Sequence, residues 1–168
     1  MEILLAVLIG ILWSQVISHF GASILLHRHY CHKQFKVPVW FEWVGLWMLS
    51  VAYIRTPIGW IASHRMHHHH SDSERDPHSA KHVGFWKVLL TTWDIPSIPP
   101  KYAKDLFANP RLVFFHKHHV KILLAHNIIS FAISPYFWIS YAAVPFVFAK
   151  AGFGLLNTIG HRTEGGAN

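Results

Sequence analysis

Three long apolar runs alternate with two polar stretches along the chain. The first run, residues 3–26, contains no charged side chain, and its length suffices for a transmembrane helix. The only charge ahead of it is Glu2, whereas a signal peptide begins with a basic region and has a shorter apolar core. We therefore expect residues 3–26 to form a membrane-spanning helix and not a signal peptide.

The second apolar run, residues 39–61, is less suited to crossing a membrane. It has the length of a span but contains Glu42, Arg55 and Pro57. Charged groups are costly inside a bilayer, and proline interrupts the hydrogen-bond ladder of a helix. We expect this segment to form an interfacial or re-entrant helix.

The third apolar run, residues 120–160, is long enough for two helices and is divided by Ser134-Pro135. This dipeptide indicates a tight turn, so the run predicts a transmembrane hairpin. Lys150 lies inside the second arm, where it either snorkels, faces a polar interior or indicates a later turn.

Together these patterns predict a fold class and a domain layout. We expect an all-α integral membrane protein with about three transmembrane helices and the interfacial or re-entrant helix. The polar residues 64–119 are expected to form a cytoplasmic, His-rich helical cap. Residues 1–168 are expected to be a single, partial domain.

Composition supports the membrane location and narrows the chemistry. The chain has 168 residues, of which 52% are apolar and 14% charged, whereas soluble domains carry about 25% charge. The single Cys31 excludes a disulfide framework and a cysteine-based zinc site. The net charge of +7 raises nucleic acid as a partner, but no basic face with interleaved aromatics is present, so we expect none. The most unusual feature of the composition is its histidine content, sixteen residues.

The strongest candidate for chemistry is the cluster of His64, His67 and His68. If residues 60–70 are helical, these side chains stand at i, i+3 and i+4 and share one face. Imidazole suits iron, copper, zinc and nickel, so the residue types leave the metal open. A solvated His-rich loop is the alternative, and the helical spacing argues against it.

Two further groups carry potential ligands. His27 and His32 are five positions apart, which on a regular α-helix separates their directions by about 140°. They would then bind different metals unless the helix ends between them, and by spacing alone His29 could equally be the ligand. Asn157 and His161 form an i, i+4 pair after the last apolar run, where a lone histidine can also be a capping or interfacial residue.

These groups can form one site only if they reach the same side of the membrane. A first helix that ends near His27, and a hairpin that starts from that side, bring His161 to the same face. A crossing between residues 39 and 61 would separate His27 from His64. We therefore expect residues 39–61 not to cross.

The histidine motifs form an ordered set that extends over nearly the whole chain. Its residues are His27-Arg28 with His32, then His64-Arg65-x-His67-His68 with Ser71-Asp72 and Asp76-Pro77-His78, and finally Asn157-x-x-x-His161. The set resembles that of the membrane-bound fatty acid desaturases, specifically the stearoyl or Δ9 branch. Each motif is moderately specific, and the ordered set with its Asp-Pro-His extension is highly specific.

The resemblance implies an oxidoreductase that inserts a cis double bond into a long acyl chain with O₂ and two electrons. It implies two Fe ions held by histidines on the cytoplasmic side of the bilayer, with ferredoxin or a b-type cytochrome as electron donor. The implied metal ligands are His27, His32, His64, His67, His68 and His161, with Asn157 acting through a water molecule.

Other implied site residues surround these ligands. Asp72 and Asp76 would accept hydrogen bonds from ligand rings, and His78 belongs to the extension of the second motif. For both aspartates the alternative is a helix cap or a salt bridge to Arg65 or Arg75.

Two positions bear on the substrate. Trp60 stands where the resemblance places an aromatic side chain near the acyl channel, although a buried tryptophan is also common at membrane interfaces. The acyl-CoA branch has an Arg-Asp pair where this chain has Ala62-Ser63. An acyl chain linked to a lipid or a protein is therefore expected at least as much as one linked to CoA.

The third histidine box of the family, His-x-x-His-His, is not found before Asn168. The cluster at residues 116–120 has the wrong spacing and is interpreted as an interfacial basic segment. We therefore expect a chain that is truncated before the third box, with weak iron retention and little or no turnover. The alternatives are a non-catalytic membrane metal-binding remnant of a desaturase and a di-iron membrane hydroxylase.

Overall fold

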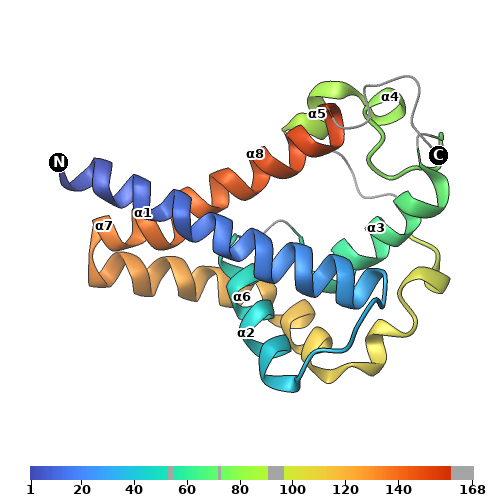
Figure 1. Ribbon diagram of the computed structural model, residues 1–168, viewed down its shortest axis with the longest axis horizontal. Coiled ribbons are helices and arrows are strands. Elements are labelled where there is room, and N and C mark those ends of the chain that lie inside the picture. The colour runs from blue at the N-terminus through green and yellow to red at the C-terminus, as the bar shows by residue number, and fades with distance from the viewer. Residues whose placement is uncertain (53–54, 72, 91–96, 160–168) are drawn as a thin grey trace.

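The computed structural model describes residues 1–52, 55–71, 73–90 and 97–159, and every regular element within these ranges is a helix (Figure 1). The elements, in chain order, are α1 (Glu2–Val16), the π-helix η1 (Ile17–Cys31), α2 (Val39–Ala52), α3 (Pro57–His70), α4 (Ala80–Val83), α5 (Phe85–Leu89), the 3₁₀ turns η2 (Pro100–Tyr102) and η3 (Leu106–Ala108), α6 (Pro110–Ile133), α7 (Pro135–Trp138), the short π-helix η4 (Ile139–Ala143) and α8 (Val144–Ile159).

Two helical stretches are long and apolar enough to cross a membrane. The first joins α1 to η1 over Glu2–Cys31, and the second joins α7, η4 and α8 over Pro135–Ile159. A third candidate arises only if the bent pair of α2 and α3 is counted as one span. The first stretch continues past residue 26, the end expected from hydropathy, and thereby carries His27 on its last turns.

The segment expected as one interfacial or re-entrant helix consists of two helices inclined to one another by 88°. Helix α2 ends at Ala52, and α3 begins at Pro57, where proline suits the first turn because it lacks the N–H that would have no partner there. The side chain of Thr56 caps α3 by accepting a hydrogen bond from the Gly59 N–H at 3.2 Å. The bend directs α3 along the end of η1.

Close backbone approach holds α2 against η1. A Cβ atom added at Gly45 would lie 2.5 Å from a methyl carbon of Leu25, and one added at Gly21 would lie 2.7 Å from Leu49 Cγ. Larger residues at either glycine would push the two helices apart. This packing sets where the C-terminal turns of η1 lie.

The expected hairpin of residues 120–160 begins earlier than its hydropathy suggests. Helix α6 starts at Pro110, after the Asn109 side chain, which accepts hydrogen bonds from two N–H groups of the first turn. It ends at Ile133, and Ser134 then caps α7. The basic segment around residues 116–120 therefore lies within the first turns of α6.

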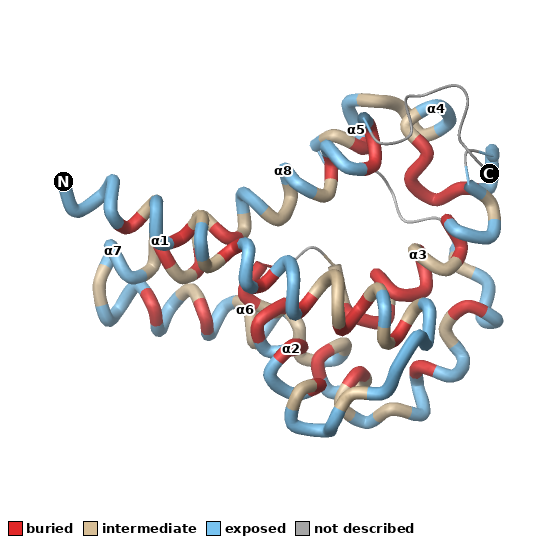
Figure 2. Tube along the Cα trace, in the orientation of Figure 1, coloured by how far each residue is buried: buried red, intermediate tan, exposed pale blue. Residues whose placement is uncertain are grey.

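The core lies where η1, α2, α3 and α6 meet, and Figure 2 shows buried positions gathered there. Leu25, Leu46, Ile61 and Leu112 are almost completely buried in it. By contrast, α1 leaves large apolar side chains such as Leu4 exposed. An exposed apolar helix surface of this kind suits contact with lipid.

Candidate metal centre

The two histidines of η1 converge because this helix has π winding. The His32 N–H donates to the His27 carbonyl, five residues back, at 3.0 Å. Positions five apart therefore lie near the same face, and the Nε2 atoms of His27 and His32 are 3.1 Å apart. The divergence of about 140° expected for α-helical winding does not arise.

The two histidines of α3 converge by the ordinary α-helical route. His64 and His68 are four positions apart, so they lie one above the other on the same face. Their Nε2 atoms are 3.0 Å apart, and their ring centroids are 4.6 Å apart. Each helix thus presents a pair of imidazoles with nearly the same separation.

The two pairs meet to form one cluster, which we call the four-histidine cluster: His27, His32, His64 and His68. The ring centroids of His27 and His64 are 4.9 Å apart, and those of His32 and His68 are 4.6 Å apart. One nitrogen of each ring lies within 4.8 Å of the corresponding nitrogens of the other three. His32 and His68 are exposed, whereas His27 and His64 are half-buried.

The donor set of this cluster fits a first-row transition metal. Two imidazole nitrogens bound to one ion at about 2.0–2.1 Å, with an angle of about 90–110° between the bonds, lie about 2.9–3.4 Å apart. The nitrogen separations of 3.1 Å in η1 and 3.0 Å in α3 fall in this range. Neutral imidazoles suit iron, copper, zinc or nickel.

A second group, which we call the buried triad, consists of His67, Asp76 and His78, all of which are buried. The Asp76 carboxylate lies 2.8 Å from His67 Nδ1 and accepts the hydrogen bond from it in the neutral Nδ1–H tautomer. The other Asp76 oxygen accepts from the His78 N–H at 3.1 Å. Asp76 thereby fixes the direction of the His67 ring.

His67 thus lies apart from its two neighbours in the second motif, although the sequence placed all three on one face. Its ring stacks on His78 with centroids 4.3 Å apart, whereas the His64 ring is 5.9 Å away. The four-histidine cluster and the buried triad are neighbours along α3. Arg65, one of the two salt-bridge partners considered for Asp76, pairs with Asp105.

Curated proteins of one kind match the chain. The Δ9 acyl-lipid desaturase 2 of Arabidopsis thaliana is 44% identical over 79 residues, which are 46% of this chain and 25% of the relative. The sn-1 stearoyl-lipid 9-desaturase of Anabaena variabilis is 31% identical over 125 residues, covering 71% of this chain and 45% of the relative. The Δ9 desaturase-like 1 protein of Arabidopsis thaliana is 28% identical over 148 residues, covering 87% and 47%. The chain belongs to the fatty acid desaturase family.

This desaturase family member spans less than half the length of the relatives named here. No family model and no solved structure matched it. Its family is one of oxidoreductases, and its apolar helices together with these relatives make it a membrane protein.

The C-terminal residues of the expected ligand set are only partly described in this desaturase family member. Asn157 is buried near the end of α8, where its side-chain N–H donates to the Phe153 carbonyl at 2.7 Å. Phe153, one turn earlier, lies against His78, with ring centroids 5.9 Å apart. The end of α8 therefore approaches the buried triad. His161 and Asp72 lie outside the described residues.

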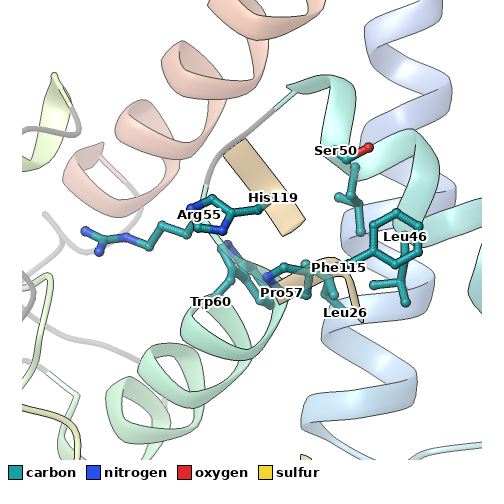
Figure 3. Close-up of a pocket in the computed structure, with 9 residues that line it drawn as sticks. Leu26, Leu46, Ser50, Arg55, Pro57, Trp60, Phe115 and His119 are labelled. Atoms are coloured by element: carbon teal, nitrogen blue, oxygen red, sulfur yellow. The ribbon is translucent and has the colours of Figure 1, made fainter. Parts of the chain in front are cut away.

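Trp60 joins the four-histidine cluster to a narrow apolar pocket. Its ring stacks on His64 with centroids 4.7 Å apart and an angle of 16° between the planes. It also lines a cavity of about 20 Å³, room for about one water molecule (Figure 3). Four helices (η1, α2, α3 and α6) and the bend between α2 and α3 contribute the lining residues, which are Leu26, Leu46, Leu49, Ser50, Arg55, Pro57, Trp60, Phe115 and His119.

A polar network at the end of η1 was not anticipated from the sequence. Glu42 is buried, and its carboxylate accepts hydrogen bonds from the Tyr30 hydroxyl, the Asn109 amide at 2.9 Å and Arg111 Nε at 2.7 Å. It links η1, α2 and the start of α6 beside the first histidine pair. The one available signal was Glu42 itself, an isolated acid in an apolar run.

Proposed function

We propose that this chain builds an iron centre of a fatty acyl desaturase, which inserts a cis double bond into a long acyl chain of a membrane lipid. The convergence of His27, His32, His64 and His68 carries the proposal, because one nitrogen of each of the four imidazoles lies within 4.8 Å of the others. The relatives support the reaction class, since they are named acyl-lipid and stearoyl-lipid desaturases.

In this proposal the four-histidine cluster holds one ion and His67 contributes to a second. Asp76 keeps the His67 ring in one tautomer and one direction, which leaves Nε2 as the metal-binding atom. Asn157, acting through a water molecule, and His161 are proposed as further ligands of the second ion. Two iron ions, when bound, supply the activation of O₂ and the removal of two hydrogen atoms from the acyl chain.

The protein places this chemistry beside its apolar interior. Trp60 stacks on the metal-binding His64 and also lines the apolar pocket, so it connects the centre to the space proposed for an acyl chain. The pocket holds about one water molecule in this conformation, so an acyl chain enters only as its walls move apart.

The membrane arrangement that we propose follows the two apolar stretches. Residues 2–31 and 135–159 cross the bilayer, α6 crosses between them as the first arm of the hairpin, and α2 and α3 turn back without crossing, as their inclination of 88° allows. Both histidine-bearing ends then lie on the cytoplasmic side. Electrons come from ferredoxin or a b-type cytochrome in the same compartment.

Elemental analysis and lipid profiling test the proposal together. The chain is expressed with a parallel His64→Ala variant, purified in detergent and analysed for iron, while the acyl lipids of the expressing cells are analysed for double bonds. Because the third histidine box is not found before Asn168, we expect weakly retained iron and at most a small yield of new cis double bonds with the wild type, and neither with the variant. The Glu74→Gln variant, which changes an exposed carboxylate, is the matched control.

The other outcomes assign different functions. Bound iron with unchanged lipids would indicate a metal-binding membrane protein without catalysis. Hydroxylated acyl chains would indicate a membrane hydroxylase. A wild-type protein that retains no metal would contradict the centre itself.

A further inference from the structure

The guanidinium group of Arg65 bonds to three separate segments beside the four-histidine cluster. Its Nη2 donates to the Tyr30 carbonyl at 2.7 Å, and its Nη1 donates to the Tyr102 carbonyl at 3.0 Å. The same two nitrogens bind the Asp105 carboxylate in a fork, at 3.1 Å and 2.7 Å. One side chain thereby joins α3 to η1, to η2 and to the turn before η3.

One of these contacts, to Tyr30, joins the two helices that carry the histidines. Arg65 follows His64 directly on α3, and Tyr30 lies between His27 and His32 on η1. The Tyr30 carbonyl belongs to the last turn of η1, where carbonyls lack partners within the helix. Arg65 supplies that partner and connects the backbone of one histidine pair to the neighbour of the other.

The chemistry of this contact requires arginine. A guanidinium offers five N–H donors in a rigid plane, so it can hold a carboxylate in a fork and still reach two carbonyls. A lysine ammonium has its N–H donors on one nitrogen atom, so it cannot reach all three sites. The Arg65 side chain is only 15% exposed, so its charge needs the opposite charge of Asp105.

We propose that Arg65 is a positioning residue that sets the separation of the two histidine pairs and thereby the metal affinity of the four-histidine cluster. The proposal rests on the metal centre proposed above. Metal–nitrogen bonds tolerate changes of only about 0.2 Å, so a small displacement of η1 relative to α3 removes a ligand. Asp105 acts through Arg65 by holding its planar group in the orientation that reaches Tyr30.

The test is a titration of the full chain in detergent with Co²⁺, whose visible absorption reports its coordination geometry. We expect Arg65→Lys to weaken Co²⁺ binding by about 10–100-fold, as for other residues that orient metal ligands, and to change the absorption bands. Asp105→Asn keeps Arg65 in place and is expected to weaken binding severalfold. Lys33→Gln removes the other cation that faces Asp105, at 3.1 Å, and is expected to leave binding unchanged.

Circular dichroism of the metal-free variants separates positioning from folding. A folded Arg65→Lys protein with wild-type affinity and wild-type bands would overturn the proposal. If Arg65→Lys does not fold, wild-type binding by a folded Asp105→Asn protein would overturn it instead. If the wild type binds no Co²⁺, the proposed metal centre fails and the role of Arg65 fails with it, whereas loss in the variant alone supports both.

Discussion

The histidine pairs of η1 and α3 reach the same geometry by different helical winding. In η1 the pair is five residues apart and its Nε2 atoms are separated by 3.1 Å, whereas in α3 the pair is four residues apart and separated by 3.0 Å. A π-helix closes its hydrogen bonds five residues back, and an α-helix closes them four residues back. Winding therefore decides which sequence spacing brings two ligands together.

The chain contains an internal control for each pair. His69 is five positions after His64, but α3 has α-helical winding, and His69 lies beside Tyr102 with ring centroids 6.0 Å apart. Cys31 is four positions after His27, but η1 has π winding, and the Cys31 thiol donates to the Ile61 carbonyl at 3.8 Å. Neither side chain belongs to the four-histidine cluster.

The largest loss of metal affinity is expected when one of the two α3 histidines, His64 or His68, is removed. We expect His68→Ala to weaken Co²⁺ binding by more than about 100-fold, since loss of a ligand costs more than loss of a residue that orients one. His69 is the adjacent imidazole and should not substitute for it. His69→Ala is the matched control, and titration should show wild-type binding. Rescue by His69 in the His68→Ala variant would contradict the role assigned to winding.

The next effect comes from changing the spacing in η1. The double variant Cys31→His and His32→Ala gives η1 the spacing of α3 without changing the number of imidazoles. We expect Co²⁺ affinity to fall by about 100-fold, as in His32→Ala alone, because π winding turns position 31 toward Ile61. If the double variant binds like the wild type, η1 does not have π winding around its histidines.

A smaller loss of metal affinity is expected from a change in the buried triad, whose His67 lies on α3 between His64 and His68. Asp76→Asn removes the carboxylate that orients His67, so binding of a second Co²⁺ should weaken by about 10–100-fold while the first is retained. The stoichiometry of a titration followed by elemental analysis measures this. Equal loss of both ions would show that the two groups are one site, and Glu74→Gln should change neither.

The smallest expected effect is a pH dependence of the contact that holds the two pairs together. Hydrogen bonds from Arg65 lower the pKa of Asp105 from its ordinary value of about 3.9 to about 2. A lowered pKa gives stability that is present above about pH 4 and is lost as the pH falls toward 2. Asp105 is 44% exposed, so the contribution is limited to about 1 kcal/mol.

Thermal unfolding of the metal-free protein measures this contribution. The wild type should unfold at a higher temperature than Asp105→Asn above about pH 4, and the difference should shrink between pH 4 and 2 and disappear below pH 2. A difference that persists unchanged at pH 2 would show that Asp105 acts without its charge.

The two pairs also differ in how far the sequence could predict them. The i, i+4 spacing of His64 and His68 was enough to predict the α3 pair. The turn at Ser134-Pro135 could also be predicted locally, because Ser134 caps the next helix. The π winding of η1 has no such signal, because the spacing of five between His27 and His32 does not itself report how the helix winds. The orientation of His67 depends on Asp76, nine residues away across a loop, which helical periodicity cannot report.

The exposure of the histidines sets an order for loading metal. His32 and His68 are exposed, so an ion can enter the four-histidine cluster from water after the chain has folded. His67 is buried with Asp76 and His78, so an ion bound there must be enclosed while the chain folds or admitted by local opening. If the chain binds the two iron ions proposed above, iron shortage after synthesis should empty the four-histidine cluster quickly and the buried position only as fast as the protein opens.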